Sequence, residues 1–250
     1  MKMNSIFSSL TLTFTAVALC ASPAWSGVFT DNFDRENSPI FDPDASASVG
    51  AGYVLSQTGE AGTPTAAIQS GKIVIGRAGE GITENSVLRY EGLALPDSNE
   101  KSFRVDLDVT TMKLITGSVS YGLVFNYQTG GADGGSFYVA RLNNGDGVQL
   151  QILKVSPAGV PVTWVDVGSP TPLEPGATYH LTITSSVNGM FEYDLSGPGI
   201  EAGSLTGIYR DAEPLSGGFA GLYVSSTSPE PKADEEAVAK FDNFTITINP

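Results

Sequence analysis

The chain carries three side chains whose chemistry suits proton abstraction from a sugar acid. His180 is the only histidine, and it is expected on the polar side of its strand, whereas Tyr138 and Arg141 share another segment. An arginine that binds a uronate carboxylate lowers the cost of removing the neighbouring proton, and a tyrosine or histidine can accept that proton. The alternative is an ordinary surface histidine together with an arginine that pairs with an acid. No spacing in the sequence forces these side chains together.

Paired carboxylates are a second source of chemistry, because glycoside hydrolysis uses two acids that flank one bond. Asp106 and Asp108 are two residues apart in a strand-like segment, so they share a face at roughly 7 Å by strand rise. Glu192 and Asp194 repeat the pattern. Two acids on the wet face of a strand are usually solvated, and neither pair has a recognisable partner.

Metal binding by zinc geometry is excluded, because the chain has one histidine and its single cysteine, Cys20, lies near the start. Calcium prefers oxygen ligands from carboxylates, amides and carbonyls. Asp31 and Asn32 near one end, and Asp242 near the other, would come close if the terminal strands pair. The sequence therefore predicts a structural calcium there, while Asp-Asn pairs also mark turns and β-bulges.

The segments that must position these residues are almost all strands. β-branched and aromatic residues alternate with polar ones, and Gly, Pro, Asn and Asp separate the runs. Asn188-Gly189 predicts a tight hairpin. Such a pattern favours two packed antiparallel sheets over a parallel α/β fold. The clearest predicted strands are 72–77, 102–112, 118–128, 136–142, 147–154, 161–167, 178–187, 190–195, 218–224 and 240–248.

The first residues have the layout of a secretory signal peptide. Lys2 precedes an apolar run over 6–19, and Ala24-Trp25-Ser26 supplies small residues at the two cleavage positions. Residues 1–26 are therefore expected to be removed, which leaves 27–250 as one domain without cysteine. Export without disulfides suits a bacterial route to the periplasm or the outside.

Charge restricts the partners of the chain. It has 27 acidic against 13 basic residues and a formal net charge of −14. This surface argues against nucleic acid and anionic membranes, and no second apolar segment predicts membrane insertion. The oligomeric state cannot be read from the sequence.

Four motifs, taken in order, resemble one family. The chain reads FTDNFDR at 29–35, YGLVFNY at 121–127, FYVAR at 137–141 and FDNFTI at 241–246. This layout is similar to the laminin-G-like branch of the concanavalin A-like lectins and glucanases, as found in secreted bacterial modules. Two features depart from that family. Tyr53 stands about where related modules carry a tryptophan, and Asp106-Leu107-Asp108 lacks the glutamates of the glucanase motif.

The resemblance implies an all-β, two-sheet antiparallel jelly-roll sandwich whose terminal strands lie side by side. It also implies carbohydrate binding on the concave sheet, frequently with calcium, so a secreted polysaccharide-binding protein is the expected function. The expected sugar contacts are Asn126, Gln128, Tyr138 and Arg141. The alternatives are a polysaccharide lyase that uses His180, Arg141 and Tyr138, a hydrolase of the same fold, and a structural or adhesive extracellular protein. Aromatic rings that could stack on a sugar, if they are not in the core, are Tyr121, Tyr127, Tyr138, Trp164 and Tyr209.

Overall fold

The computed structural model describes residues 26–34, 52–58, 63–78, 84–97, 101–111, 119–129, 135–144, 148–156, 161–169, 173–203, 205–226 and 239–250. The predicted leader lies outside this part except for Ser26, and so do most of the acidic segment 225–236 and the side chain of Trp164. Within the described ranges, no helix has the length and apolar character that crossing a membrane requires.

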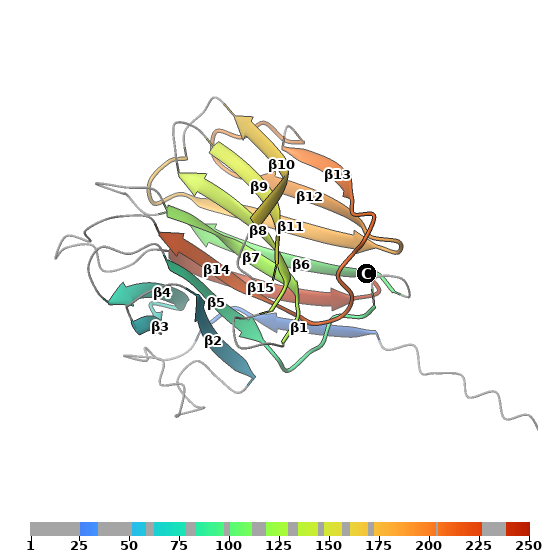
Figure 1. The fold of residues 1–250 in the computed structure, drawn as a ribbon. Helices are drawn as coiled ribbons and strands as arrows, with labels where there is room; N and C mark the ends of the chain where they lie inside the picture. The colour runs from blue at the N-terminus through green and yellow to red at the C-terminus, as the bar shows by residue number, and fades with distance from the viewer. Residues whose placement is uncertain are drawn as a thin grey trace, which may run out of the picture.

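Two antiparallel sheets face each other and form a jelly-roll sandwich (Figure 1). We name the eight-stranded sheet A and the seven-stranded one B. In sheet B, the order is β10 (Pro161–Ser169), β9 (Val148–Val155), β8 (Phe137–Asn144), β7 (Val119–Tyr127), β14 (Phe219–Ser226), β5 (Glu84–Tyr90) and β2 (Tyr53–Thr58). In sheet A, the order is β13 (Thr206–Arg210), β12 (Met190–Ser196), β11 (Thr178–Ser186), β6 (Phe103–Thr110), β15 (Ala239–Ile248), β4 (Lys72–Ala78) and β3 (Thr63–Gln69), with β1 (Gly27–Asp31) also paired to β15.

All ten predicted strands are present, with ends shifted by a few residues. The ten predicted strands do not include β1, which was expected only as a terminal strand, or β2, β3, β5 and β13, which are short or carry polar and small residues. The hairpin between β11 and β12 is confirmed, with positive φ at Asn188 (66°) and Gly189 (67°). Its loop is one residue longer than expected, because Ser186 pairs with Met190 and Val187 joins the turn.

The terminal strands lie side by side, as predicted. β15 pairs with β4 over its first three residues and with β1 over its last five, so β4 and β1 follow one another along the same edge. A register shift between Asp242 and Thr245 confirms the expected bulge, and Asn243 within it has a φ of 49°. The bulge keeps both Phe241 and Phe244 buried, although they are three residues apart.

The core lies between the two sheets, where alternate residues of every long strand meet. Phe191 of sheet A contacts both Phe125 and Tyr138 of sheet B, with ring centroids 5.3 and 5.0 Å away. Phe125 and Tyr138 stack on each other at 5.0 Å. Because the inward positions are fixed by this packing, the residues between them must point outward on each sheet.

Candidate functional site

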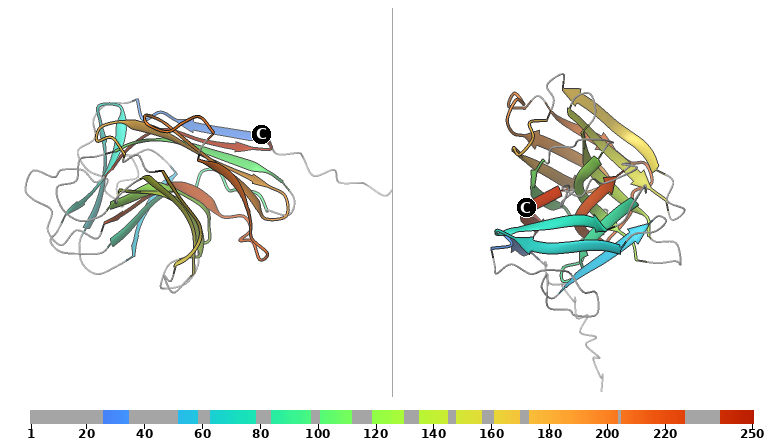
Figure 2. Two further views of the ribbon diagram at one scale, coloured as in Figure 1. Left: turned by 90° about the horizontal axis from the view of Figure 1, so that it is seen from above. Right: turned by 90° about the vertical axis from the view of Figure 1, so that its left-hand side faces the viewer.

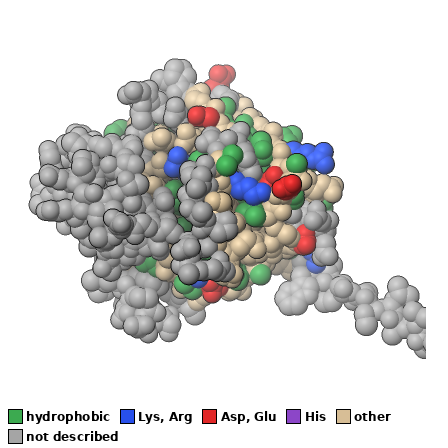
Figure 3. Space-filling view, viewed as in Figure 1, with side chains coloured by type: hydrophobic (Ala, Val, Ile, Leu, Met, Phe, Trp, Pro, Cys, Tyr) green, Lys and Arg blue, Asp and Glu red, His purple; other side chains and the backbone are tan. Residues whose placement is uncertain are grey.

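The outer face of sheet B is the concave side of the molecule. Seen from above, its strands bend so that their hollow side turns away from sheet A (Figure 2). One end of this face is apolar and forms a cluster of its own, separate from the core. The other end is polar. Figure 3, which looks onto this side of the sandwich, shows basic, acidic and apolar side chains close together.

Two registered rows of residues build the polar end. Tyr223 of β14 pairs with Gly122 of β7, which pairs with Arg141 of β8, which in turn pairs with Gln151 of β9. Two residues further along each strand, Ser225 of β14 pairs with Ser120 of β7, which pairs with Asn143 of β8. All point away from the core, because their neighbours in sequence are core residues. We call this set the polar stripe; its members are Ser120, Arg141, Asn143, Gln151, Tyr223 and Ser225.

Arg141 is held in the polar stripe by an uncharged partner. Its Nε and Nη2 both donate to Oε1 of Gln151, at 3.0 and 2.8 Å. Burial raises the pKa of Tyr223, while hydrogen bonds from Ser225 and Arg141 act in the opposite direction. Tyr223 therefore stays a neutral phenol at physiological pH and does not neutralise the neighbouring guanidinium.

Two further features leave the polar stripe open to an incoming group. Oδ1 of Asn143 is buried and has no hydrogen-bond partner among the described residues, which is unfavourable for an amide oxygen unless a ligand or water supplies a donor. Gly122 separates Tyr223 from Arg141 in their row, and a Cβ there would overlap the carbonyl oxygen of Ala140. The close approach of β7 and β8 thus requires glycine, and no side chain stands between the phenol and the guanidinium.

The apolar end of the concave face holds aromatic rings. Tyr127 and Phe137 stack with centroids 5.2 Å apart, and the guanidinium of Arg89 lies 5.1 Å from the Tyr127 ring centroid. Arg89 also pairs with Glu91 at 2.6 Å. Both rings are about 95% buried, since their exposed fractions are 4% and 5%. They are not open platforms for sugar stacking, and Tyr121 and Tyr138 belong to the core.

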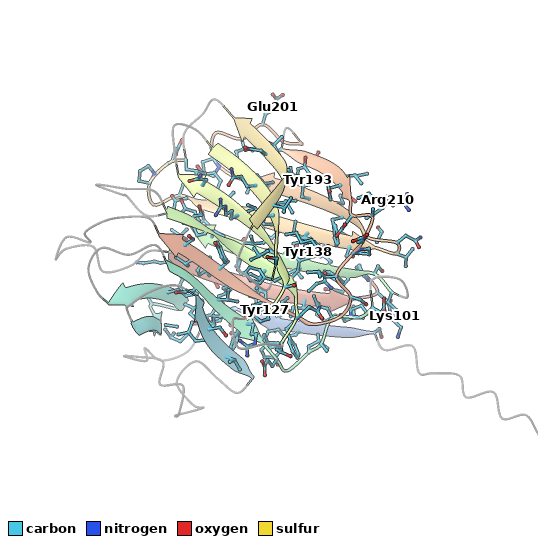
Figure 4. The ribbon with its side chains drawn as sticks, viewed as in Figure 1. Lys101, Tyr127, Tyr138, Tyr193, Glu201 and Arg210 are labelled. Carbon is cyan, nitrogen blue, oxygen red and sulfur yellow. The ribbon has the colours of Figure 1, made fainter. Side chains whose placement is uncertain are left out.

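Three of the residues predicted to contact sugar hold a connector instead. Segment 211–218 leads from β13 to β14, and Tyr138 fixes its start by donating to Asp211 at 2.6 Å and accepting from the backbone N–H of Leu215 at 2.8 Å. Asn126 donates to the carbonyl of Gly217 at 2.8 Å, and Gln128 donates to that of Ser216 at 2.9 Å. In Figure 4, Tyr138 lies near the centre of the sheets as viewed, and its side chain is fully buried. These side chains are therefore occupied within the fold.

Asp211 anchors this connector as a carboxylate. Burial alone would raise its pKa, but hydrogen bonds from Tyr138 and Lys154 outweigh burial and lower it. Lys154 approaches at 2.9 Å and also donates to the carbonyl of Glu213 at 2.6 Å. Burial and the bond to Asp211 raise the pKa of Tyr138. A phenol with a raised pKa, committed to two bonds, is a poor proton acceptor.

His180 lies on the opposite side of the molecule from Arg141, on the outer face of sheet A. Its Nδ1 is 2.6 Å from Asp108, and its Nε2 is 3.4 Å from Asp106. These two carboxylates raise the pKa of His180 to about 9 against the effect of burial. The structure does not bring His180, Arg141 and Tyr138 together, because one faces out from each sheet and the third is in the core. An imidazolium paired with two acids is not a general base at neutral pH.

The two acid pairs on sheet A have different surroundings. Asp106 also pairs with Arg104 at 2.6 Å and accepts from Thr182 at 2.8 Å. The bonds from His180, Arg104 and Thr182 lower the pKa of Asp106 despite its burial. Asp106 and Asp108 therefore belong to an ion-pair network with Arg104 and His180. Glu192 and Asp194 line a shallow polar hollow of about 450 Å³ beside Arg104.

The residues predicted to bind calcium each have an oxygen that already accepts a bond. Asp31 accepts from the backbone N–H of Phe33 at 2.8 Å and from the hydroxyl of Tyr53 at 3.1 Å. Asn32 accepts from the N–H of Asp34 at 3.2 Å, and Asp242 from that of Asn243 at 2.8 Å. In the described part of the chain, no three His, Cys, Asp or Glu side chains are grouped to hold a metal.

Comparison with known proteins supports the fold. No protein-family model and no curated protein sequence match the chain. Among solved structures, the CBM2 module of the evolved Dit protein of Lactobacillus casei BL23 phage J-1 superposes with a TM-score of 0.53 at 12% identity, over 90% of this chain and 98% of the module. The fold is a two-sheet antiparallel jelly-roll sandwich, which the phage module shares.

Two further neighbours superpose less closely. Lectin II from Ulex europaeus has a TM-score of 0.49 at 12% identity, over 89% of this chain and 98% of the lectin. An alginate lyase variant in complex with an alginate trisaccharide also has 0.49 at 12%, over 88% of this chain and 97% of the lyase. At these identities the likeness concerns the fold and assigns no residue a role.

Proposed function

We propose that this protein binds a polysaccharide on the concave face of sheet B, through the polar stripe. Sugar sites combine amides, hydroxyls and charged groups that hydrogen-bond the sugar hydroxyls in a concave surface. The stripe supplies each of these groups from four neighbouring strands. The observation that carries the proposal is the guanidinium of Arg141, held by the neutral Gln151, on the same strand face as Asn143, whose Oδ1 has no partner among the described residues. The family resemblance of the sequence and the name of the phage module point to the same class of ligand.

Binding without catalysis is the form that the geometry favours. The described residues do not bring the predicted base and neutralising group of a lyase together, and Asp106 and Asp108 are engaged in ion pairs. The protein would therefore retain a polysaccharide without cleaving it. It would do so outside the cytoplasm if residues 1–26 act as the predicted signal peptide.

Affinity electrophoresis in gels that contain single polysaccharides tests the proposal. We expect retardation on at least one glycan, and loss of that retardation in Asn143→Ala and Gln151→Ala variants with unchanged far-ultraviolet circular dichroism. The matched control is Thr182→Ala, on the outer face of sheet A. Failure to bind any glycan in a broad panel would contradict the proposal and favour the structural or adhesive alternative.

A structural calcium near the paired termini remains part of the proposal. Burial raises the pKa of Asp242, and the neighbouring Asp108 and Asp34 act in the same direction. A divalent cation would relieve that repulsion, whereas Asp31 would have to share oxygens that already accept bonds. We expect the melting temperature to rise when calcium is added to chelated protein. An unchanged midpoint counts against the ion.

A further inference from the structure

Arg141 differs from three other cations of the two sheets, each of which pairs with an acid. Arg89 pairs with Glu91, Arg104 with Asp106, and Lys154 with Asp211, each within 2.9 Å. Arg141 is also partly buried and fixed in direction, yet among the described residues its partners are Gln151 and Tyr223, both neutral. This pattern is unexpected in a chain with 27 acidic and 13 basic residues.

The nearest acid in register does not neutralise it. Gln151 pairs with Asp166 of β10, so Asp166 stands two strands from Arg141, at about 10 Å by strand spacing. Asp166 is exposed to solvent, where a charge at that distance is largely screened. Gln151 holds the guanidinium by Nε and Nη2 and leaves Nη1 free of that bond. A partly buried guanidinium that a neutral side chain orients keeps its charge available for an anionic group of a ligand.

We infer that the ligand of the polar stripe is an anionic glycan and that Arg141 binds its acidic group, a uronate carboxylate or a sulfate ester. This inference rests on the proposed function and narrows its substrate class. The neighbouring side chains suit the hydroxyls of such a sugar, since Oδ1 of Asn143 can accept a hydrogen bond from one of them. The contact has to be local, because the net charge of −14 repels a polyanion at long range.

The salt dependence follows from this balance. For a basic protein on a polyanion, affinity falls steeply as salt rises. Here salt screens the repulsion between two acidic molecules as well as the attraction at Arg141. We therefore expect a shallow dependence of affinity on salt rather than a steep loss.

The test measures dissociation constants of the purified protein for a uronate polymer, the same polymer after reduction of its carboxyl groups, a sulfated galactan and a neutral glucan. Wild type should bind the uronate or the sulfated polymer at least about tenfold more tightly than the reduced polymer and the glucan. Whichever polymer is bound identifies the acidic group. Arg141→Met should weaken that binding by roughly 10- to 100-fold. Arg141→Lys, which keeps the charge, should lose less, and Arg104→Met on sheet A should stay within about twofold.

Two results would overturn the inference while the proposed function stands: equal binding of charged and neutral polymers, or equal affinity of Arg141→Met and wild type for the charged one. If wild type binds none of the four polymers, nor any other glycan, both proposals fail together. Circular dichroism and melting temperature establish that each variant is folded.

Discussion

The outer faces of the two sheets use the same strand alternation in opposite ways. On sheet A, Arg104, Asp106, His180 and Asp108 neutralise one another across β6 and β11. On sheet B, Arg141 and its neighbours are joined by hydrogen bonds between a cation and neutral groups. These four charges of the first face balance, so their network contributes to stability. On the second face, the charge of Arg141 has no acid partner and Oδ1 of Asn143 has no donor among the described residues, so this face is suited to a ligand.

The largest expected difference between the two faces is in the free energy of unfolding of variants on each face. Asp106→Ala removes the shared acceptor of Arg104, His180 and Thr182, and should lower the free energy of unfolding by about 2 kcal/mol. Gln151→Ala frees only Arg141, which water can reach, and should cost less than about 1 kcal/mol. Urea unfolding of both variants measures the difference. Equal costs would show that the two faces are not specialised.

The connector residues provide a second test, with a somewhat smaller effect. Tyr138→Phe keeps the ring in the core but removes the hydroxyl that Asp211 and the N–H of Leu215 use, so it should lower the free energy of unfolding by roughly 1–2 kcal/mol. Affinity for glycan should not change, because the hydroxyl faces the connector. A large loss of affinity with unchanged stability would restore Tyr138 as a sugar contact.

The smallest effect concerns pH and belongs to sheet A alone. The pKa of His180 is about 9 in the folded protein against an ordinary value of 6.5, so its stabilising contribution is complete below pH 6.5 and is lost as the pH rises through 9. For a half-exposed group, we expect less than about 1 kcal/mol. Unfolding free energies at pH 6 and pH 10 should differ less in His180→Asn than in wild type. An identical difference in both would contradict the network.

The sequence predicts the architecture well because alternation reports which residues face the core. In Phe103–Thr110, every second residue is apolar, and the burial follows that pattern. Strand β5 escaped prediction because it opens with polar residues, and β3 because Pro64 and two alanines weaken its signal. Their partners in the sheets, not their own composition, keep them extended.

The site was predicted less well, because position in a strand gives a face but not the contacts on it. Arg141 lies on the concave face as expected, whereas Tyr138, three residues earlier, has the opposite parity and is buried. That parity could have been read from the sequence. The missed members of the stripe are Ser120, Asn143, Gln151, Tyr223 and Ser225, and only the order of strands in sheet B places them together.

The most direct measurement follows the side-chain N–H signals of arginine and glutamine by nuclear magnetic resonance during titration with a bound oligosaccharide. The Arg141 Nε–H and the Gln151 amide should shift with one common dissociation constant. The Arg104 Nε–H, held by Asp106 on the other sheet, should not move. Shifts at Arg104 with none at Arg141 would contradict a ligand site on the concave face.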